Sequence, residues 1–488
     1  MKLASLLHAV EVVARTAPDS LEISGVCCDS RLARAGDLFV AIHGHQDEGY
    51  RHIEQALARG AVAIAAERPP PPTGPGWIHL ADARRALARL ACAIHDHPSH
   101  TLAVYGVTGT NGKTTVAGLL RDVLQAEGRK TGLISTVEYS YGDRIIAASR
   151  TTPDSCELQG LLGAMRNDGC QAAVMEVSSH ALDQHRTGDI RFAAAAFTNL
   201  TRDHFDYHHD FETYFRAKCR LFEQLSALHP GAPAVVNRDD PYGRRLIEQA
   251  AGLGLHPVAY GLDAAADIRA TDLQLDAQGS RFLLQTPAGS QALSVALLGR
   301  FNVANLLCVA GLALAAGIPF DRLCETLQRA RPRWGRLEKV EARHPAAIFV
   351  DYAHTDDALR NVLATLRELA PRRLIVVFGC GGDRDRAKRP LMGRVAAELA
   401  DEIIVTSDNP RSEDPEAIIA EITAGIAGKP VQTDPDRRAA IGRALRTAGK
   451  GDIVLIAGKG HETYQETRHN RFAFDDRAEV RSLATHGS

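Results

Sequence analysis

Continuous apolar runs that alternate with helical patterns organise most of this chain. The runs cover residues 102–107, 172–177, 193–198 and 234–236 in the middle of the chain, and 347–351, 373–378, 402–406 and 452–457 near its end. Runs without polar alternation are typical of strands buried on both faces of a parallel sheet. We therefore predict an α/β fold with two parallel sheets, each covered by helices.

The first hundred residues have a different pattern, with shorter strand-like pieces at 21–28, 37–42 and 61–65. Prolines and glycines at 69–76 exclude a helix or a central strand there and predict a surface loop. Two further segments, 95–100 and 331–336, interrupt the helical patterns with proline or glycine. These interruptions predict three domains, at residues 1–98, 99–331 and 332–488.

The run at 102–107 leads into a glycine-rich loop and then a helical pattern at 116–124. Glycines let such a loop point backbone N–H groups at an anion, and the helix N-terminus adds partial positive charge. Lys113 can reach the outer phosphates of a nucleotide, and the hydroxyl of Thr114 or Thr115 can bind Mg²⁺. The loop is a variant, because Val107 stands where the usual pattern has its first glycine.

Polar clusters follow the next two runs and should face the phosphate loop, since ligands collect at the carboxyl ends of parallel strands. Glu176 and His204 in these clusters are candidate Mg²⁺ ligands, although histidine is less usual for this ion. A zinc site and a solvated loop remain alternatives for the histidine cluster. Lys218 lies on an amphipathic helical pattern, which by itself favours a solvated charge.

Four polar or glycine clusters also follow the four runs of the last third, and together they predict a charged cleft at one sheet edge. Near residue 300, two side-chain amides stand at the start of an alanine-rich helical pattern. A role as the N-cap of this helix would explain one of the two amides. The nucleotide loop and the cleft suggest ATP bridging two bodies that close over a reaction. A kinase, an ATP-driven ligase and a mechanical ATPase all remain open on this pattern.

Composition narrows the class of protein. The 488 residues are 45% hydrophobic and 24% charged, with a net charge of −2, so no basic field favours nucleic acid or an anionic membrane. The nine cysteines form no C-x-x-C pair, which is typical of reduced intracellular thiols. No signal peptide or membrane span is indicated, and we expect a cytoplasmic protein.

Four motifs together resemble the Mur ligases of peptidoglycan synthesis. They are Gly109-Thr110-Asn111-Gly112-Lys113-Thr114, Glu176-Val177-Ser178-Ser179-His180, Asn199-Leu200-Thr201-Arg202-Asp203-His204 and Asp351-Tyr352-Ala353-His354. The resemblance implies a central ATP-binding domain between a small uridine-binding N-terminal domain and a Rossmann-like C-terminal domain. Three more motifs are similar to the members that extend UDP-N-acetylmuramoyl-L-alanyl-D-glutamate by meso-diaminopimelate. These motifs are Thr151-Thr152-Pro153, Gly381-Gly382-Asp383-Arg384 and Asp408-Asn409-Pro410-Arg411.

The reaction implied by this resemblance uses ATP as co-substrate and Mg²⁺ as cofactor. ATP phosphorylates the D-glutamyl carboxylate, and the amine of the diamino acid then attacks the acyl phosphate. Lys113, Lys218 and His204 are the implied catalytic residues. Lys218 matches a lysine that family members carbamylate, which would replace the solvated-charge interpretation by a metal ligand beside Thr114, Glu176 and His204.

The resemblance also assigns the remaining contacts. ATP would contact Gly109, Thr110, Asn111, Gly112, Lys113, Thr114, Thr115, Asn302, Arg336, Asp351 and His354. The UDP-muramoyl dipeptide would contact Ser30, His45, Thr151, Thr152, Ser179 and Arg186. The diamino acid would contact Arg384, Asp408, Asn409, Arg411, Gly458 and Glu462. Arg411 can pair with the distal carboxylate that lysine lacks.

Three alternatives stay open: a lysine-adding ligase, a ligase of the folylpolyglutamate synthase kind, and a nucleotide-binding regulator without turnover. The expected partners are the small-molecule substrates alone, without nucleic acid or membrane insertion, and we expect a monomer.

Overall fold

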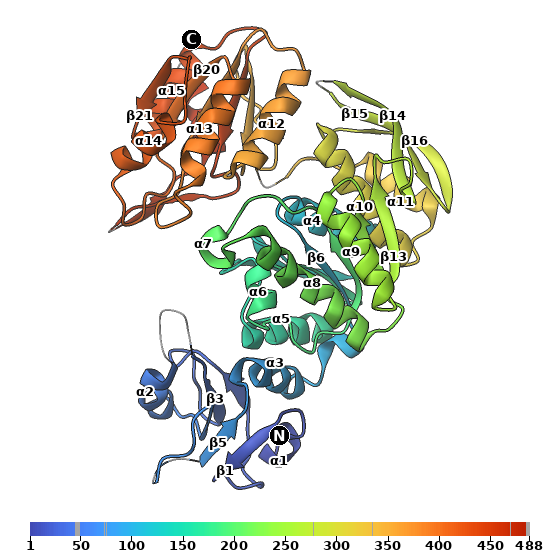
Figure 1. Ribbon diagram of the computed structural model, residues 1–488, viewed down its shortest axis with the longest axis vertical. Helices are drawn as coiled ribbons and strands as arrows, with labels where there is room; N and C mark the ends of the chain where they lie inside the picture. Colours follow the sequence, from blue (N-terminus) through green and yellow to red (C-terminus); the bar gives the residue numbers. More distant parts are fainter. Residues whose placement is uncertain are drawn as a thin grey trace.

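The computed structural model describes residues 1–43, 49–72, 74, 76–276, 278–333, 335–468 and 470–484. Three α/β units follow one another along its long axis, as the colours from blue to red show in Figure 1. The expected substrate contact of His45 lies outside the described residues. The domain boundaries at 98 and 331 stay predictions, and each unit is described below by its sheet.

The first unit is built on a five-stranded sheet with the order β1-β5-β4-β3-β2. Its strands are β1 (Val12–Arg15), β2 (Gly25–Cys27), β3 (Asp37–Ala41), β4 (Ala63–Ala66) and β5 (Gly76–Leu80). All pair in parallel except β1, which runs antiparallel to β5. The helical segments are α1 (Leu3–Leu7), η1 (Gly49–His52), α2 (Ile53–Ala58), α3 (Ala83–Ile94) and η2 (Pro98–His100).

The middle unit holds an eleven-stranded sheet whose order is β16-β15-β14-β13-β12-β11-β6-β10-β7-β8-β9. The predicted runs form β6 (Ala103–Thr108), β10 (Ala172–Glu176), β11 (Phe192–Phe197) and β12 (Pro233–Asn237). They pair in parallel, which confirms the predicted parallel sheet for its centre. Seven further strands are β7 (Thr131–Ile134), β8 (Glu138–Tyr141), β9 (Arg144–Ala147), β13 (His256–Gly261), β14 (Ile268–Asp276), β15 (Gly279–Thr286) and β16 (Gly289–Val295).

Both edges of this sheet are antiparallel, and no continuous apolar run predicted them. Buried and exposed residues alternate along β14 to β16, because one face of these strands meets water. Such alternation contains no continuous apolar run. The predicted parallel sheet is therefore correct for the centre and wrong for the edges.

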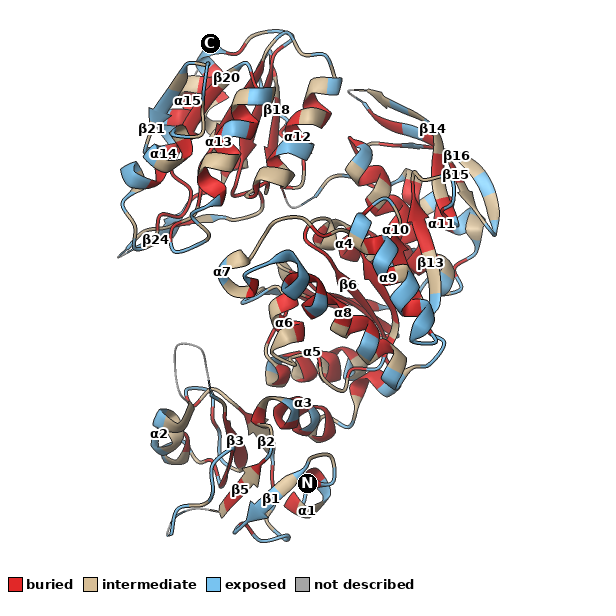
Figure 2. Ribbon diagram, in the orientation of Figure 1, coloured by how far each residue is buried: buried red, intermediate tan, exposed pale blue. Residues whose placement is uncertain are grey.

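Helices cover both faces of the middle sheet, and each face has its own apolar core. They are α4 (Lys113–Ala126), α5 (Ser155–Asn167), α6 (Ser179–Asp183), α7 (Phe205–His208), α8 (Phe211–Leu228), α9 (Pro241–Gly252), α10 (Arg300–Ala315) and α11 (Phe320–Gln328). Helix α10 is apolar nearly all round and is buried beside α4, as the red ribbons of Figure 2 show.

The C-terminal unit has a six-stranded sheet with the order β17-β18-β22-β19-β20-β21. The four predicted runs form β18 (Ala347–Asp351), β19 (Leu374–Phe378), β20 (Glu402–Thr406) and β22 (Ile453–Ala457), all in parallel register. Four further strands, which no apolar run predicted, are β17 (Glu338–Lys339), β21 (Val431–Asp434), β23 (Tyr464–Glu466) and β24 (Arg471–Ala473). The helices are α12 (Asp356–Glu368), α13 (Lys388–Leu399), α14 (Pro415–Thr423), α15 (Arg437–Thr447) and α16 (Asp476–Ala484).

None of the nine cysteines, all of which lie in the described ranges, takes part in a disulfide. Within the described ranges, each helix is too short or too polar to span a lipid bilayer.

Candidate functional site

The glycine-rich loop connects β6 to α4 at the carboxyl edge of the middle sheet. Two of its glycines are required by backbone geometry. Gly109 has φ of 144° and a Cβ there would lie 1.9 Å from Thr198 Oγ1, while Gly112 has φ of 88° and its Cβ would lie 2.4 Å from Asn305 Oδ1. Only glycine permits this turn and these close approaches.

Two residues after β11 hold the loop in place. The backbone N–H groups of Thr110 and Asn111 donate to the carbonyl oxygen and to Oδ1 of Asn199, both at 2.9 Å. The Thr198 hydroxyl donates to the Asn111 carbonyl at 2.6 Å. The expectation that the cluster after this strand faces the loop is therefore confirmed. Thr198 and Asn199 themselves were absent from the predicted contacts.

Two lysine amines converge on the loop. Lys113 Nζ donates to the carbonyl oxygens of Gly109 and Thr110 at 3.0 and 2.8 Å. Lys218 Nζ donates to the same Gly109 oxygen at 2.8 Å, and only 1% of Lys218 is exposed. Burial lowers the pKa of both amines, that of Lys218 well below its ordinary value. The solvated-charge interpretation of Lys218 is wrong, because α8 turns this residue into the interior.

Carboxylates and histidines complete the middle unit's side of the site. Glu176, at the end of β10, accepts hydrogen bonds from the N–H and hydroxyl of Thr136 at 2.8 and 3.1 Å. His204 Nε2 lies 3.3 Å from Asp203 Oδ2, and its ring meets that of His180 at 4.8 Å. Burial lowers the pKa of His204 to about 3, which leaves its imidazole neutral at physiological pH.

The C-terminal unit reaches the phosphate loop through Arg336. Its Nη2 donates to Thr114 Oγ1 at 3.0 Å, and its guanidinium lies 4.5 Å above the ring of Tyr352. Asp351 accepts from the N–H groups of Leu337 and Ala353 at 2.5 and 2.7 Å, which orders the chain between Arg336 and β18. Burial raises the pKa of Asp351 to about 6.

The two units share one cavity of about 430 Å³. It brings together these residues of the predicted ATP and metal sets: Thr110, Asn111, Gly112, Lys113, Thr114, Thr115, Glu176, His204, Arg336, Asp351 and His354. Gly109 and Lys218 lie behind this lining, in contact with each other.

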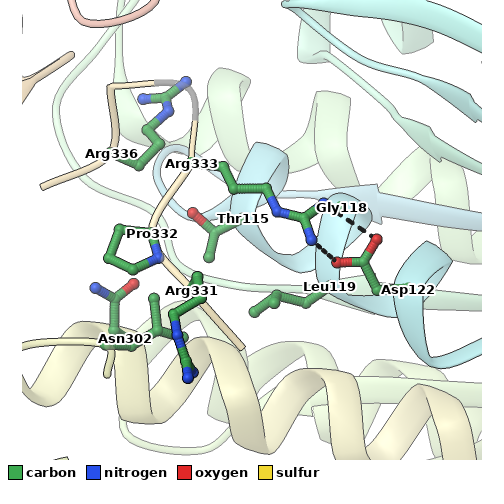
Figure 3. A pocket seen from close by; sticks show the side chains of 10 residues that line it. Thr115, Gly118, Leu119, Asp122, Asn302, Arg331, Pro332, Arg333 and Arg336 are labelled. Atoms are coloured by element: carbon green, nitrogen blue, oxygen red, sulfur yellow. Dashed lines mark hydrogen bonds and ion pairs between the residues drawn. The ribbon is translucent and has the colours of Figure 1, made fainter. Parts of the chain in front are cut away.

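Asn302 lies elsewhere. It lines a small hollow of about 20 Å³ next to the cavity, together with Thr115, Arg331, Pro332, Arg333 and Arg336. Figure 3 shows Arg333 in this hollow with its guanidinium paired to Asp122, 2.7 Å away. Helix α10 is capped by Gly299, and Asn302 Nδ2 donates to the Leu298 carbonyl, so neither amide serves as the N-cap.

Several residues that line the cavity were missed by the sequence reasoning: Asp203, Asn237, Asp239, Tyr260, Arg300, Phe301, Asn305 and Tyr352. Asn237 ends β12 and Asp239 follows it, so the strand-end rule that found Glu176 and His204 would have found them too. Asn305 offered no comparable signal, because it lies one turn inside a helix.

A second polar network lies at the carboxyl edge of the C-terminal sheet. Lys459 is fully buried, and its Nζ lies 3.0 Å from Asn409 Oδ1, 3.2 Å from Glu462 Oε2 and 3.8 Å from Asp408 Oδ1. Asn409 Nδ2 donates to the same Glu462 oxygen at 2.8 Å. Burial and the nearby Asp408 raise the pKa of Glu462. Lys459 was not among the predicted residues, yet it joins three that were.

The other predicted residues of this region surround the network. Arg411 Nη1 donates to the Gly382 carbonyl at 2.8 Å, and Arg411 Nε lies 3.2 Å from Glu466. A Cβ at Gly458 would lie 2.5 Å from Asp408 Oδ2, so this position brings the backbone against the carboxylate. Arg384 is exposed and donates to the Asp383 carbonyl.

A separate cavity of about 430 Å³ lies between the first and middle units, and it contains both Ser30 and Arg186. The Ser30 hydroxyl donates to Gln55 Oε1 at 2.7 Å, and Arg186 Nη1 donates to the Thr152 carbonyl at 2.9 Å. Thr151 lines the phosphate-loop cavity instead. Thr152 and Ser179 are buried and line neither cavity: the Thr152 hydroxyl donates to the Glu176 carbonyl oxygen, and the Ser179 hydroxyl is hydrogen-bonded to His208 Nε2.

This architecture defines a P-loop nucleotide-binding protein in which a second α/β unit completes the nucleotide cavity. Three protein-family models match the sequence of this chain. They are the Mur ligase family catalytic domain at residues 22–95, the Mur ligase middle domain at 107–313 and the Mur ligase glutamate ligase domain at 335–460. The chain belongs to the Mur ligase family.

Full-length relatives agree with these matches. The chain is 42% identical over 98% of both lengths to the UDP-N-acetylmuramoyl-L-alanyl-D-glutamate–2,6-diaminopimelate ligase of Geobacter sulfurreducens. It is 45% identical over 93% of both lengths to the ligase of the same name from Geobacillus kaustophilus. A solved structure of a ligase with this name matches with a TM-score of 0.70 and 35% identity, over 100% of this chain and 99% of the other.

Proposed function

We propose that this protein is an ATP-dependent ligase that joins meso-2,6-diaminopimelate to UDP-N-acetylmuramoyl-L-alanyl-D-glutamate. The observation that carries the proposal is the single cavity in which Lys113 and Thr114 of the phosphate loop meet Arg336, Asp351 and His354 of the C-terminal unit. Such a cavity can enclose ATP between two bodies and exclude water from a reactive acyl phosphate.

Nucleotide binding rests on the loop and on the C-terminal residues. The N–H groups at the start of α4 and the Lys113 amine would neutralise the phosphates, once Lys113 exchanges its two carbonyl contacts for phosphate oxygens. Arg336 is already bonded to Thr114 and would stabilise charge on the transferred phosphoryl group. Asp351 and His354 would contact the nucleoside.

The donor set in this cavity suits magnesium in part. Thr114 and Glu176 offer the oxygen ligands that Mg²⁺ prefers, and His204 is kept neutral by burial. When bound, the ion would neutralise phosphate charge during the transfer. The amine of Lys218 offers no oxygen. Its lowered pKa favours the neutral amine, which can attack CO₂, lose a proton and become a carbamate with carboxylate-like oxygens.

Two steps would then make the amide. The D-glutamyl carboxylate attacks the γ-phosphorus of ATP, giving an acyl phosphate and ADP. The amine of diaminopimelate attacks the acyl carbon, a proton is lost, and phosphate leaves. Ser30 and Arg186 would hold the UDP-sugar end of the dipeptide substrate in the cavity between the first two units. Thr151, Thr152 and Ser179 would lie along its peptide, toward the phosphate loop.

The choice of diamino acid would fall to the network around Asp408, Asn409 and Glu462, with Arg411, Gly458 and Arg384 beside it. Carboxylates of this network suit an ammonium group, and Arg411 suits the distal carboxylate. Lysine lacks that carboxylate and would leave the guanidinium without its partner, which disfavours lysine.

A phosphate-release assay with the UDP-muramoyl dipeptide, ATP and Mg²⁺ tests the proposal. Addition of meso-diaminopimelate should start turnover and give a product heavier by one diaminopimelate residue in mass spectrometry. Equal turnover with lysine would refute the specificity. Turnover with a folate and glutamate instead of these substrates would favour a ligase of the folylpolyglutamate synthase kind.

The alternative function, a nucleotide-binding regulator without turnover, is tested by comparing the activities of two variants. Lys113→Ala should abolish phosphate release while circular dichroism stays unchanged, with a loss of about 10² to 10³ or more in kcat. Lys450→Ala, at an exposed lysine away from the cavity, is the matched control and should keep full activity. Equal activity of the two variants would refute the role of the phosphate loop.

A further inference from the structure

Two cysteines and an aspartate from different units of the fold meet outside the nucleotide cavity. The Sγ atoms of Cys28 and Cys156 and a carboxylate oxygen of Asp154 all lie within 4.8 Å of one another. Cys28 follows β2 in the first unit, whereas Asp154 and Cys156 begin α5 in the middle unit. All three are half-buried, so they are held by packing and still accessible to a small ion.

The surrounding structure fixes these groups from both sides. Asp154 caps α5, because its Oδ1 accepts from the N–H groups of Cys156 and Glu157 at 3.0 and 3.1 Å. Cys28 and Cys156 both pack against the apolar core of the first unit. The three groups therefore need little rearrangement to face a common centre.

We propose that Cys28, Asp154 and Cys156 form a binding site for a thiophilic divalent cation of the Zn²⁺ and Cd²⁺ class, which links the first unit to the middle unit. Two sulfur ligands select such cations over Mg²⁺ and Ca²⁺, which prefer oxygen. Three protein ligands leave a fourth position for water in the tetrahedral geometry that Zn²⁺ adopts.

The charges at this site agree with a cation. A cysteine thiol becomes a metal ligand only after it has lost its proton. Binding would release the two thiol protons and leave two thiolates, one carboxylate and one dication. The resulting site carries one net negative charge.

The neighbouring cavity provides both access and compensation for that charge. Cys28 and Asp154 line the cavity between the first two units, together with Arg84, Arg150 and Arg186. An ion can therefore approach from this cavity, and the arginines favour the negative charge of the filled site. This inference does not depend on the proposed ligase reaction.

Cadmium titration of the full-length protein tests the site. The protein is kept reduced with a phosphine, and excess Mg²⁺ occupies oxygen-rich sites. We expect a thiolate-to-cadmium charge-transfer band in the ultraviolet that saturates at one ion per chain and is removed by Zn²⁺. Cys28→Ser and Cys156→Ser should each weaken binding about tenfold or more, since even loss of an outer-shell partner costs that much.

Two further variants sharpen the result. Cys170→Ser removes a buried thiol beyond the C-terminal end of α5, whereas the cluster lies at its N-terminal end, and should leave the titration unchanged. Asp154→Asn keeps a capping residue and removes the anionic ligand, so it should weaken cadmium binding while the circular dichroism of the protein is retained. A band of undiminished size and affinity in Cys28→Ser and Cys156→Ser would overturn the proposal. A Cys28–Cys156 disulfide in peptide mapping, with no bound ion, would overturn it as well.

Discussion

The Lys218 amine donates a hydrogen bond to the Gly109 carbonyl oxygen, 2.8 Å away, although 109 residues separate the two in the sequence. Helix α8 is thereby hydrogen-bonded to the phosphate loop. A buried amine with a lowered pKa at this point can react with CO₂, whereas a solvated lysine would stay protonated.

Lys218 should therefore carry a carbamate. Incubation of the protein with ¹³C-bicarbonate should give a carbamate carbon resonance in NMR, and Lys218→Arg should lack it, because a guanidinium stays protonated. Lys113→Arg is the matched control at the other buried amine and should keep the resonance. Its presence in Lys218→Arg would contradict the assignment.

Arg336→Ala should raise the KM for ATP by about 10- to 100-fold, because it removes a charged hydrogen bond to Thr114 and the stacking on Tyr352. Initial rates at varied ATP concentration measure this change. Arg333→Ala, three residues earlier, is the control. It disrupts a partly exposed ion pair with Asp122 and should change the KM by no more than about twofold to fivefold.

Arg411→Ala should raise the KM for meso-diaminopimelate by about 10- to 100-fold, since a hydrogen-bonded charge pair contributes about 1.5–3 kcal/mol. The KM for ATP should not change, because Arg411 does not line the nucleotide cavity. Arg468→Ala, an exposed neighbour, should leave both constants unaltered. An equal rise of both constants in Arg411→Ala would point to a general structural defect instead.

His208 should make stability depend on pH. It is buried against Ser179, and burial lowers its pKa from 6.5 to about 4. Between pH 4 and pH 6.5 the unfolded chain binds more protons at this histidine than the folded protein does. The contribution of His208 to the unfolding free energy is therefore complete above pH 6.5 and is lost as the pH falls toward 4. The unfolding free energy of the unsubstituted protein should fall between pH 7 and pH 5 by about 2 kcal/mol more than that of His208→Gln. Urea unfolding at the two pH values measures this difference. An unchanged pH dependence would contradict this assignment.

Arg437 and Asp476 form a fully buried ion pair at 2.7 Å, and Arg437 also donates to the carbonyl oxygens of Ser407 and Ala457. Arg437→Met should destabilise the C-terminal unit by about 3–5 kcal/mol, because it leaves a buried carboxylate unpaired. Hydrogen exchange of the β22 amides measures this loss.

The adjacent residue supplies the control for that variant. Arg438 lies on α15 like Arg437, and Arg438→Met breaks its half-exposed pair with Glu479 of α16, which should cost less than about 1 kcal/mol. Adding Asp476→Leu to Arg437→Met should recover most of the stability. A double variant as unstable as Arg437→Met would show that the lost carbonyl contacts, and not the unpaired carboxylate, dominate.

Much of the fold could be predicted because the strands that build the site are local apolar runs. All eight predicted runs became strands; Glu176 and Asp351 are the last residues of two of them, and His204 and Asp408 follow the ends of two others. The edge hairpins of the middle sheet were missed because an alternating strand resembles a loop when it is judged by continuous hydrophobicity.

The sequence by itself determined the phosphate loop, the strand-end clusters and the family resemblance, since each depends on residues that are close together in the chain. Only the tertiary structure decided that Lys218 is buried, that Arg336 reaches Thr114, and that Asn305 lines the cavity from which Asn302 is excluded. It also brought Cys28 beside Cys156. The physical reason is that such contacts arise from the packing of helices and units against one another, and no local pattern of residues records that packing.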